Sequence, residues 1–157
     1  MRNVRVERTL AVDRSSVWAV LADYPNIADW NHGLKKSYAI GDATEGVGAQ
    51  RQTELVPAGA MRETVVEWVP EEKMVIAIDE IEKMPVKQAR MTFTLSGDET
   101  TVVAMTYEYE PKGGASRFHS GADTRPADEQ GFQRFHRLSG ASRPGQSNRL
   151  TKTAARP

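Results

Sequence analysis

The segment from Leu34 to Glu110 most constrains the fold, because its apolar and polar residues alternate with a period of two. Such alternation is typical of strands that have one buried face and one face in water. Turn residues interrupt the pattern at Gly41-Asp42, Gly46 to Gly48, Pro57 to Gly59, Pro70 to Lys73, Lys83 to Pro85 and Ser96 to Glu99. The intervals are too short for crossover helices, so the pattern predicts an antiparallel meander.

The last two predicted strands show which residues share a face. The first, Val86 to Leu95, and the second, Thr101 to Glu110, both carry large apolar side chains at alternate positions. This set consists of Met91, Phe93, Leu95, Val103, Met105, Tyr107 and Tyr109. We expect these side chains to point toward a core or a ligand, and Gln88, Arg90 and Thr92 to point to the opposite face.

The N-terminal region begins with a different arrangement. Alternating valines predict a first strand from Arg2 to Val12. Asp13 is then placed to cap a helix, and the apolar stripe that follows includes Val17, Trp18, Val20 and Leu21. Pro25 fits the first turn of a second short helix ending near Trp30, because its missing N–H would have no helical partner there.

This order of elements resembles the START-like (SRPBCC) helix-grip superfamily, in particular its polyketide cyclase/dehydrase-like branch. The run from Asp13 to Asn31 and the loop Gly46-Val47-Gly48 carry the resemblance, which covers roughly residues 3 to 112. It implies an α+β fold with a bent antiparallel sheet of about seven strands and two short helices after the first strand. A C-terminal helix would lie across the open side of the sheet and enclose an apolar cavity.

The residues after Pro111 differ in composition, so we divide the chain into a START-like unit, 1–111, and an atypical tail, 112–157. The tail contains no Val, Ile, Met, Trp or Tyr and is rich in Gly, Arg, Ser and Ala. A short helix is predicted at 126–139, with a narrow stripe of Phe132, Phe135 and Leu138. Two explanations remain open. The C-terminal helix is naturally weak or truncated, or the reading frame shifts near Gly113-Gly114, since out-of-frame GC-rich DNA encodes these residue types.

Charge and composition exclude several classes of protein. Residues 1–111 hold 12 Lys and Arg against 18 Asp and Glu, whereas residues 112–157 hold 9 against 3. The tail arginines form no compact basic run, so we expect no nucleic-acid partner. The absence of cysteine excludes disulfides and a cysteine nucleophile and fits a reducing compartment. No apolar stretch has the length of a membrane span, and we expect a cytoplasmic protein.

No motif in the chain compels an enzyme. It lacks a Gly-x-Ser-x-Gly elbow, a phosphate-binding loop with lysine and a His-Glu-x-x-His pair. The three histidines, His32, His119 and His136, lack metal-ligand spacing, so we expect neither a metal nor another cofactor. Glu63, Asp79 and Glu80 would be acid/base candidates only where an apolar site raised their pKa.

Arg51 is the polar residue most relevant to a site. If Ala49 and Thr53 face inward, strand parity directs Arg51 inward with them. A guanidinium in an apolar interior requires either a carboxylate, such as Glu63 on the next strand, or a ligand oxygen. The resemblance implies that an arginine on this strand and a tryptophan at the position of Trp30 shape a polyketide pocket. The hydroxyl residue that the branch carries two places earlier is Ala49 here.

The function predicted first is cytoplasmic binding of a small hydrophobic ligand, lipid-like or polyketide-like, by Trp30, Arg51, Phe93, Tyr107 and Tyr109. One alternative is a polyketide cyclase/dehydratase that uses the same pocket. Another is a stress-response or toxin-like module that acts through a protein partner. If the tail helix is a poor cover for the sheet, exposed apolar surface also favours a homodimer.

Overall fold

The computed structural model describes residues 1–113, which form one sheet and two short helical segments. In chain order the elements are β1 (Arg2–Leu10), α1 (Arg14–Ala22), the 3-10 segment η1 (Tyr24–Asp29), β2 (Leu34–Ile40), β3 (Gln50–Leu55), β4 (Ala60–Val69), β5 (Lys73–Glu82), β6 (Val86–Ser96) and β7 (Thr101–Pro111). The seven strands are ordered β1-β7-β6-β5-β4-β3-β2. Every neighbouring pair is antiparallel, which confirms the meander and the number of strands.

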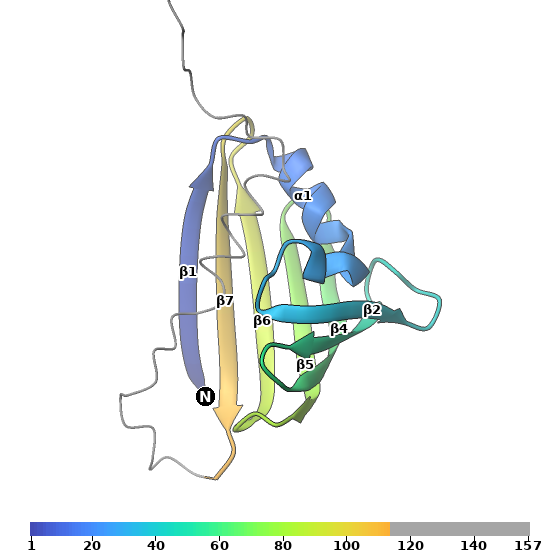
Figure 1. Cartoon of the computed structure of the whole chain (residues 1–157). Coiled ribbons are helices and arrows are strands. Elements are labelled where there is room, and N and C mark those ends of the chain that lie inside the picture. Colours follow the sequence, from blue (N-terminus) through green and yellow to red (C-terminus); the bar gives the residue numbers. More distant parts are fainter. Residues whose placement is uncertain (114–157) are drawn as a thin grey trace, which may run out of the picture.

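The sheet bends strongly between its two edges. Figure 1 shows β2 running across the direction of β1 and β7, with α1 on the same side of the sheet as β2. Register shifts interrupt the pairing of β2 with β3 once and that of β4 with β5 twice. Such bulges increase the local twist, so this half of the sheet curls over the inner face of β5, β6 and β7. We call that inner face the concave face.

Helix α1 begins where the sequence predicts. The carboxylate of Asp13 accepts hydrogen bonds from the Ser16 backbone N–H and from both serine hydroxyls that follow it, at 2.6–2.9 Å. These bonds stabilise the ionised form and lower the pKa of Asp13 from 3.8 to about 2. β1 ends two residues earlier than expected, at Leu10. Val12 is nevertheless buried, and its carbonyl accepts a 2.8 Å hydrogen bond from Thr101.

The second predicted helix is correct in place but only partly correct in kind. η1 is a 3-10 segment, and Asn26 inside it has a non-helical backbone with φ −98° and ψ 23°. The side chain of Asn26 donates to Asp23 at 2.8 Å, and the Ala28 N–H donates to Ser37 on β2 at 3.1 Å. Because the Ala28 N–H bonds to a side chain and not to a helical carbonyl, the segment does not continue as an α-helix.

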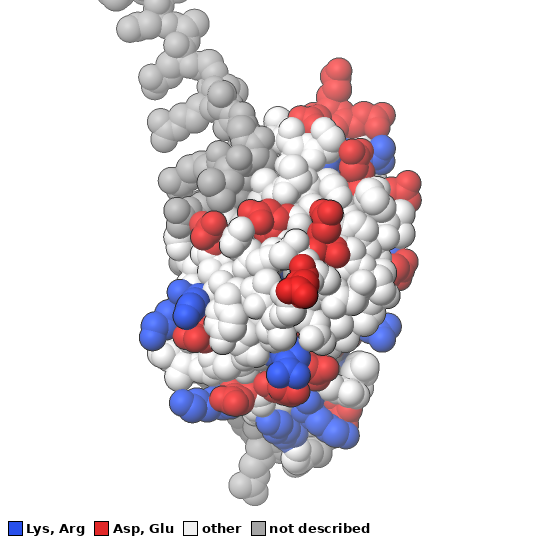
Figure 2. All heavy atoms as spheres, turned by 90° about the vertical axis from the view of Figure 1, so that its right-hand side faces the viewer, with Lys and Arg blue, Asp and Glu red and all other residues white. Residues whose placement is uncertain are grey.

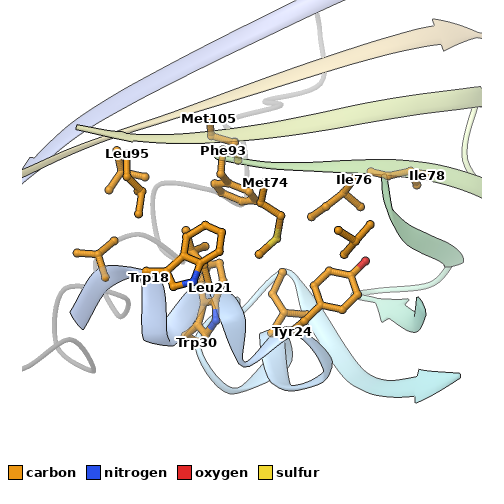
Figure 3. Close-up of a cluster of buried hydrophobic side chains, with 14 of the residues drawn as sticks. Trp18, Leu21, Tyr24, Trp30, Met74, Ile76, Ile78, Phe93, Leu95 and Met105 are labelled. Carbon is orange, nitrogen blue, oxygen red and sulfur yellow. The ribbon is translucent and has the colours of Figure 1, made fainter. Parts of the chain in front are cut away.

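The core lies between α1, η1 and the concave face, as Figure 3 shows. Trp18 of α1 packs edge-on against Trp68 of β4, with ring centroids 5.1 Å apart. The predicted parity of the last two strands is correct. Phe93, Leu95, Val103 and Met105 are buried, and Met91, Tyr107 and Tyr109 pack against the core. On the opposite face, Gln88 and Arg90 are exposed.

Several sequence predictions fall outside the described residues. These are the helix at 126–139, the C-terminal helix implied by the resemblance, and the positions of His119 and His136. The division at residue 111 and the question of the reading frame remain predictions.

Candidate ligand site

A small internal cavity lies between the helical segments and the sheet. Trp30, Arg51 and Phe93 line it, together with Leu21, Met74 and Ile76. The space available to the centre of a water-sized molecule is about 10 Å³, which is room for about one water molecule. Three of the five residues predicted to bind a ligand thus line one cavity, although Trp30 directly follows η1 and the other two come from β3 and β6.

Arg51 is buried and paired. Its side chain is directly opposite Glu63 across the β3–β4 pairing, and the exposed fractions of the two residues are 2% and 1%. The guanidinium forms an ion pair with the Glu63 carboxylate, and its Nε donates to Oε2. The Thr53 hydroxyl lies 3.4 Å from both the other carboxylate oxygen of Glu63 and the Met61 carbonyl, and its one proton can be donated to either. The sequence left two partners open for Arg51, a carboxylate or a ligand oxygen. In the structure its partner is the Glu63 carboxylate.

The same guanidinium also fixes Tyr24, which sequence reasoning missed. Nη1 of Arg51 donates to the Tyr24 carbonyl at 2.6 Å, and the guanidinium lies over the Tyr24 ring at 4.0 Å from its centroid. Tyr24 is 1% exposed, and burial raises the pKa of its phenol above the ordinary value of 10. Its hydroxyl therefore stays protonated at physiological pH. The available signal was the aromatic residue directly before Pro25, where the short helix begins.

The Tyr24 hydroxyl has no hydrogen-bond partner within residues 1–113. In Figure 3 the ring extends from the helical segment toward the strands. The hydroxyl oxygen points to the side where Ile76 and Ile78 lie, away from Trp18 and Trp30. A buried hydroxyl without a partner loses its hydrogen bonds to water and destabilises the fold.

Tyr107 and Tyr109 lie on the concave face but do not line the small cavity. Both are half-buried, and their ring centroids are 5.7 Å apart. The strand register connects Tyr109 to the buried ion pair, because one cross-strand row runs Arg51, Glu63, Ile78, Ala89, Tyr109. The adjacent row runs Val65, Ile76, Met91, Tyr107. Arg51, Tyr107 and Tyr109 therefore lie in two adjacent cross-strand rows of the concave face.

Comparison with known proteins agrees with this architecture. A family model described as polyketide cyclase / dehydrase and lipid transport matches residues 1–137. The chain belongs to this family. The crystal structure of an uncharacterised protein from Bacillus thuringiensis is similar in fold, with a TM-score of 0.66 and 11% sequence identity. The match covers 88% of this chain and 98% of that one. No curated protein sequence matches the chain.

The remaining candidates of this polyketide cyclase/dehydrase-family chain lie away from the cavity. Asp79, Glu80 and His32 are exposed, and Glu80 pairs with Arg62 at 2.7 Å. Gly46 and Gly48 have positive φ angles of 79° and 91°, as a tight loop requires. The residues described here contain no cluster of side chains suited to a metal ion, and none of their helices is long and apolar enough to cross a bilayer.

Acidic and basic side chains are unevenly distributed over one face of the molecule. On the face shown in Figure 2, acidic side chains gather mostly in the upper half, and Lys and Arg lie mostly at the lower end. Acidic side chains also lie directly beside the basic ones at the lower end, so this face presents no continuous basic area.

Proposed function

We propose that this protein binds a small, mainly apolar molecule on the concave face, between the segment that contains Tyr24 and Trp30 and the strands β5, β6 and β7. The observation that carries the proposal is the convergence of Trp30, Arg51 and Phe93 on one cavity. Membership of a family described by lipid transport and polyketide chemistry supports a hydrophobic ligand.

A ligand needs more room than the cavity offers, since small-molecule sites typically occupy about 300–1,000 Å³. Methionine side chains are the groups most easily displaced, because they are unbranched and adopt many rotamers. Met74 lines the cavity, and Met61, Met84 and Met91 are partly buried against the core. Under this proposal the ligand displaces such side chains and extends along the concave face toward Tyr107 and Tyr109.

Two finer points belong to the same proposal. A cytoplasmic place of action is supported by the absence of cysteine.

Turnover of a poly-β-keto substrate is the second candidate function, and the family description favours it. The buried Glu63 is an unsuitable general base while its carboxylate is paired with Arg51. Unchanged recovery of a bound ligand distinguishes binding from catalysis.

Native mass spectrometry of the purified full chain tests the proposal directly. We expect a co-purifying hydrophobic molecule, and the same molecule added at 100 times its Kd should raise the free energy of unfolding by about 2.7 kcal/mol. Ala89→Leu adds bulk to the concave row between Ile78 and Tyr109 and should weaken binding at least about tenfold through overpacking of the ligand path. Ala77→Leu, on the opposite face of β5, is the matched control and should leave binding unchanged.

The proposal fails if no molecule co-purifies and no lipid or aromatic polyketide analogue raises the melting temperature. It fails as well if Ala89→Leu and Ala77→Leu alter binding equally, since the concave face would then have no special role.

A further inference from the structure

We propose, on the basis of the ligand-binding function above, that Tyr24 recognises the polar group of the ligand by donating a hydrogen bond to a neutral oxygen, such as that of a ketone, ester or alcohol. A carboxylate is excluded from this position.

The first argument is the unpartnered hydroxyl. Tyr24 is almost completely buried, and its ring is fixed by the Arg51 guanidinium above it. Its hydroxyl points to the region near Ile76 and Ile78, as Figure 3 shows. Across the neighbouring strands, the row that contains Ile76 continues to Tyr107, and the row that contains Ile78 continues to Tyr109. An oxygen of a ligand lying along these rows would give the hydroxyl the partner that it lacks within residues 1–113.

The second argument is the charge balance of the site. The Arg51 guanidinium donates from Nε to Glu63 and from Nη1 to the Tyr24 carbonyl, and its Nη2 is in ion-pair contact with the same Glu63 oxygen but makes no directed hydrogen bond among residues 1–113. The pair is electrically neutral, so Arg51 has no free charge for a second carboxylate. A ligand carboxylate would therefore be buried without a counter-charge, which is strongly unfavourable in a low-dielectric interior.

The third argument is the protonation state of the donor. The phenol of Tyr24 keeps its proton because burial raises its pKa. Tyr24 is thus a permanent neutral donor in the physiological range, and a neutral acceptor is the complement that brings no charge into the core.

Three naphthalene probes separate these requirements, each substituted at the same ring position: acetylnaphthalene, ethylnaphthalene and naphthoate. The first offers a neutral oxygen, the second offers none and the third offers a carboxylate. Titration of the full chain by calorimetry should show that the ketone binds about tenfold more tightly than the hydrocarbon, the effect of one buried hydrogen bond. Naphthoate should bind more weakly than both.

Tyr24→Phe removes the hydroxyl oxygen and retains the ring. In this variant the ketone should bind no more tightly than the hydrocarbon, whose own affinity should not change. The ligand-free variant should melt at a higher temperature than the parent, because the unpartnered hydroxyl is gone. Tyr38→Phe is the matched control, since Tyr38 is 43% exposed. It should alter neither affinity nor melting temperature.

The outcomes that overturn this inference are distinct from failure of the proposed function. If ethylnaphthalene binds but the ketone gains nothing, or Tyr24→Phe keeps the preference, Tyr24 is not the donor. Tightest binding by naphthoate would exclude a neutral ligand. A lower melting temperature of ligand-free Tyr24→Phe would mean that the hydroxyl already has a partner inside the fold. If no probe binds at all, this inference is wrong, whereas the proposed function is decided by the co-purification and melting experiments described above.

Discussion

The two ends of the concave face differ in what they bury. The end beneath α1, which we call the packed end, consists of buried apolar side chains: Trp18, Leu21, Phe93, Leu95 and Met105. The other end, which we call the polar end, contains a buried ion pair, a buried phenol and two half-buried aromatic rings: Arg51, Glu63, Tyr24, Tyr107 and Tyr109.

This difference indicates a division of roles. Apolar burial is the dominant favourable contribution to folding, and the packed end provides it. A buried ion pair adds little net stability compared with apolar residues of similar volume, and an unpartnered hydroxyl lowers stability. Local departures from a consistent core are expected at functional sites. The two ends meet at the cavity that Arg51 and Phe93 both line, and the polar end is where recognition of the polar group of the ligand is expected.

The largest effect should follow from breaking the ion pair at the polar end. Arg51→Met leaves the Glu63 carboxylate buried without a counter-charge and should lower the free energy of unfolding by about 3–5 kcal/mol. Urea denaturation measures this. The double variant Arg51→Met with Glu63→Leu should recover most of the loss. A double variant as unstable as the single one would mean that the pair itself stabilises the fold, and the contrast between the two ends would disappear.

The next largest effect should come from the packed end. Phe93→Ala removes a ring that is 4% exposed and should lower the free energy of unfolding by about 3 kcal/mol. Tyr109→Ala, on the same face but half-buried, should cost clearly less in the same denaturation experiment. Equal losses would show that the two ends are packed alike.

A smaller effect is expected for the pair Trp18 and Trp68. In a double-mutant cycle with Phe at both positions, the coupling free energy should be about 0.5–1.5 kcal/mol, because the edge-to-face geometry is lost in each single variant. Affinity for a neutral ligand should not change in either variant. Weakened binding would extend the recognition surface into the packed end.

The smallest effect concerns the cap of α1 and depends on pH. The folded-state pKa of Asp13 is about 2, below the ordinary 3.8, so its contribution to stability is complete above about pH 4 and is lost as pH falls through 2. Asp13→Ala should therefore melt below the parent at neutral pH, and the gap should narrow in acid. Asp42→Ala, in an exposed loop, should melt like the parent throughout. A gap that does not change between pH 5 and 2 would contradict this assignment.

Much of the fold was predictable because the decisive signals are local. Alternation in β6 and β7 assigned Phe93 and Met105 to the concave face, and Asp13 marked the start of α1. The same parity argument directed Arg51 inward. The 3-10 geometry of η1 was not predictable, because the Ser37 hydroxyl that accepts the hydrogen bond from the Ala28 N–H belongs to β2.

The candidate site was predictable only in part. Trp30, Arg51 and Phe93 meet at one cavity, but their role in ligand binding remains a prediction. Tyr24 was missed because its importance depends on the absence of a partner for its hydroxyl, which is a property of the surrounding packing. Likewise, no pattern of residue types reveals that the cavity has room for about one water molecule.

By itself, the sequence determined the antiparallel meander after Leu34, the faces taken by the side chains of β6 and β7, and the membership of a polyketide cyclase/dehydrase family; that β1 pairs with β7 was decided by the tertiary structure. The tertiary structure decided that the Arg51 charge is neutralised by Glu63 and that the Tyr24 hydroxyl remains without a partner among the described residues. The physical reason is the range of the interactions. The direction of a side chain follows from backbone geometry within a few residues, whereas pairing depends on register and bending that bring Arg51 to partners 12 and 27 positions away.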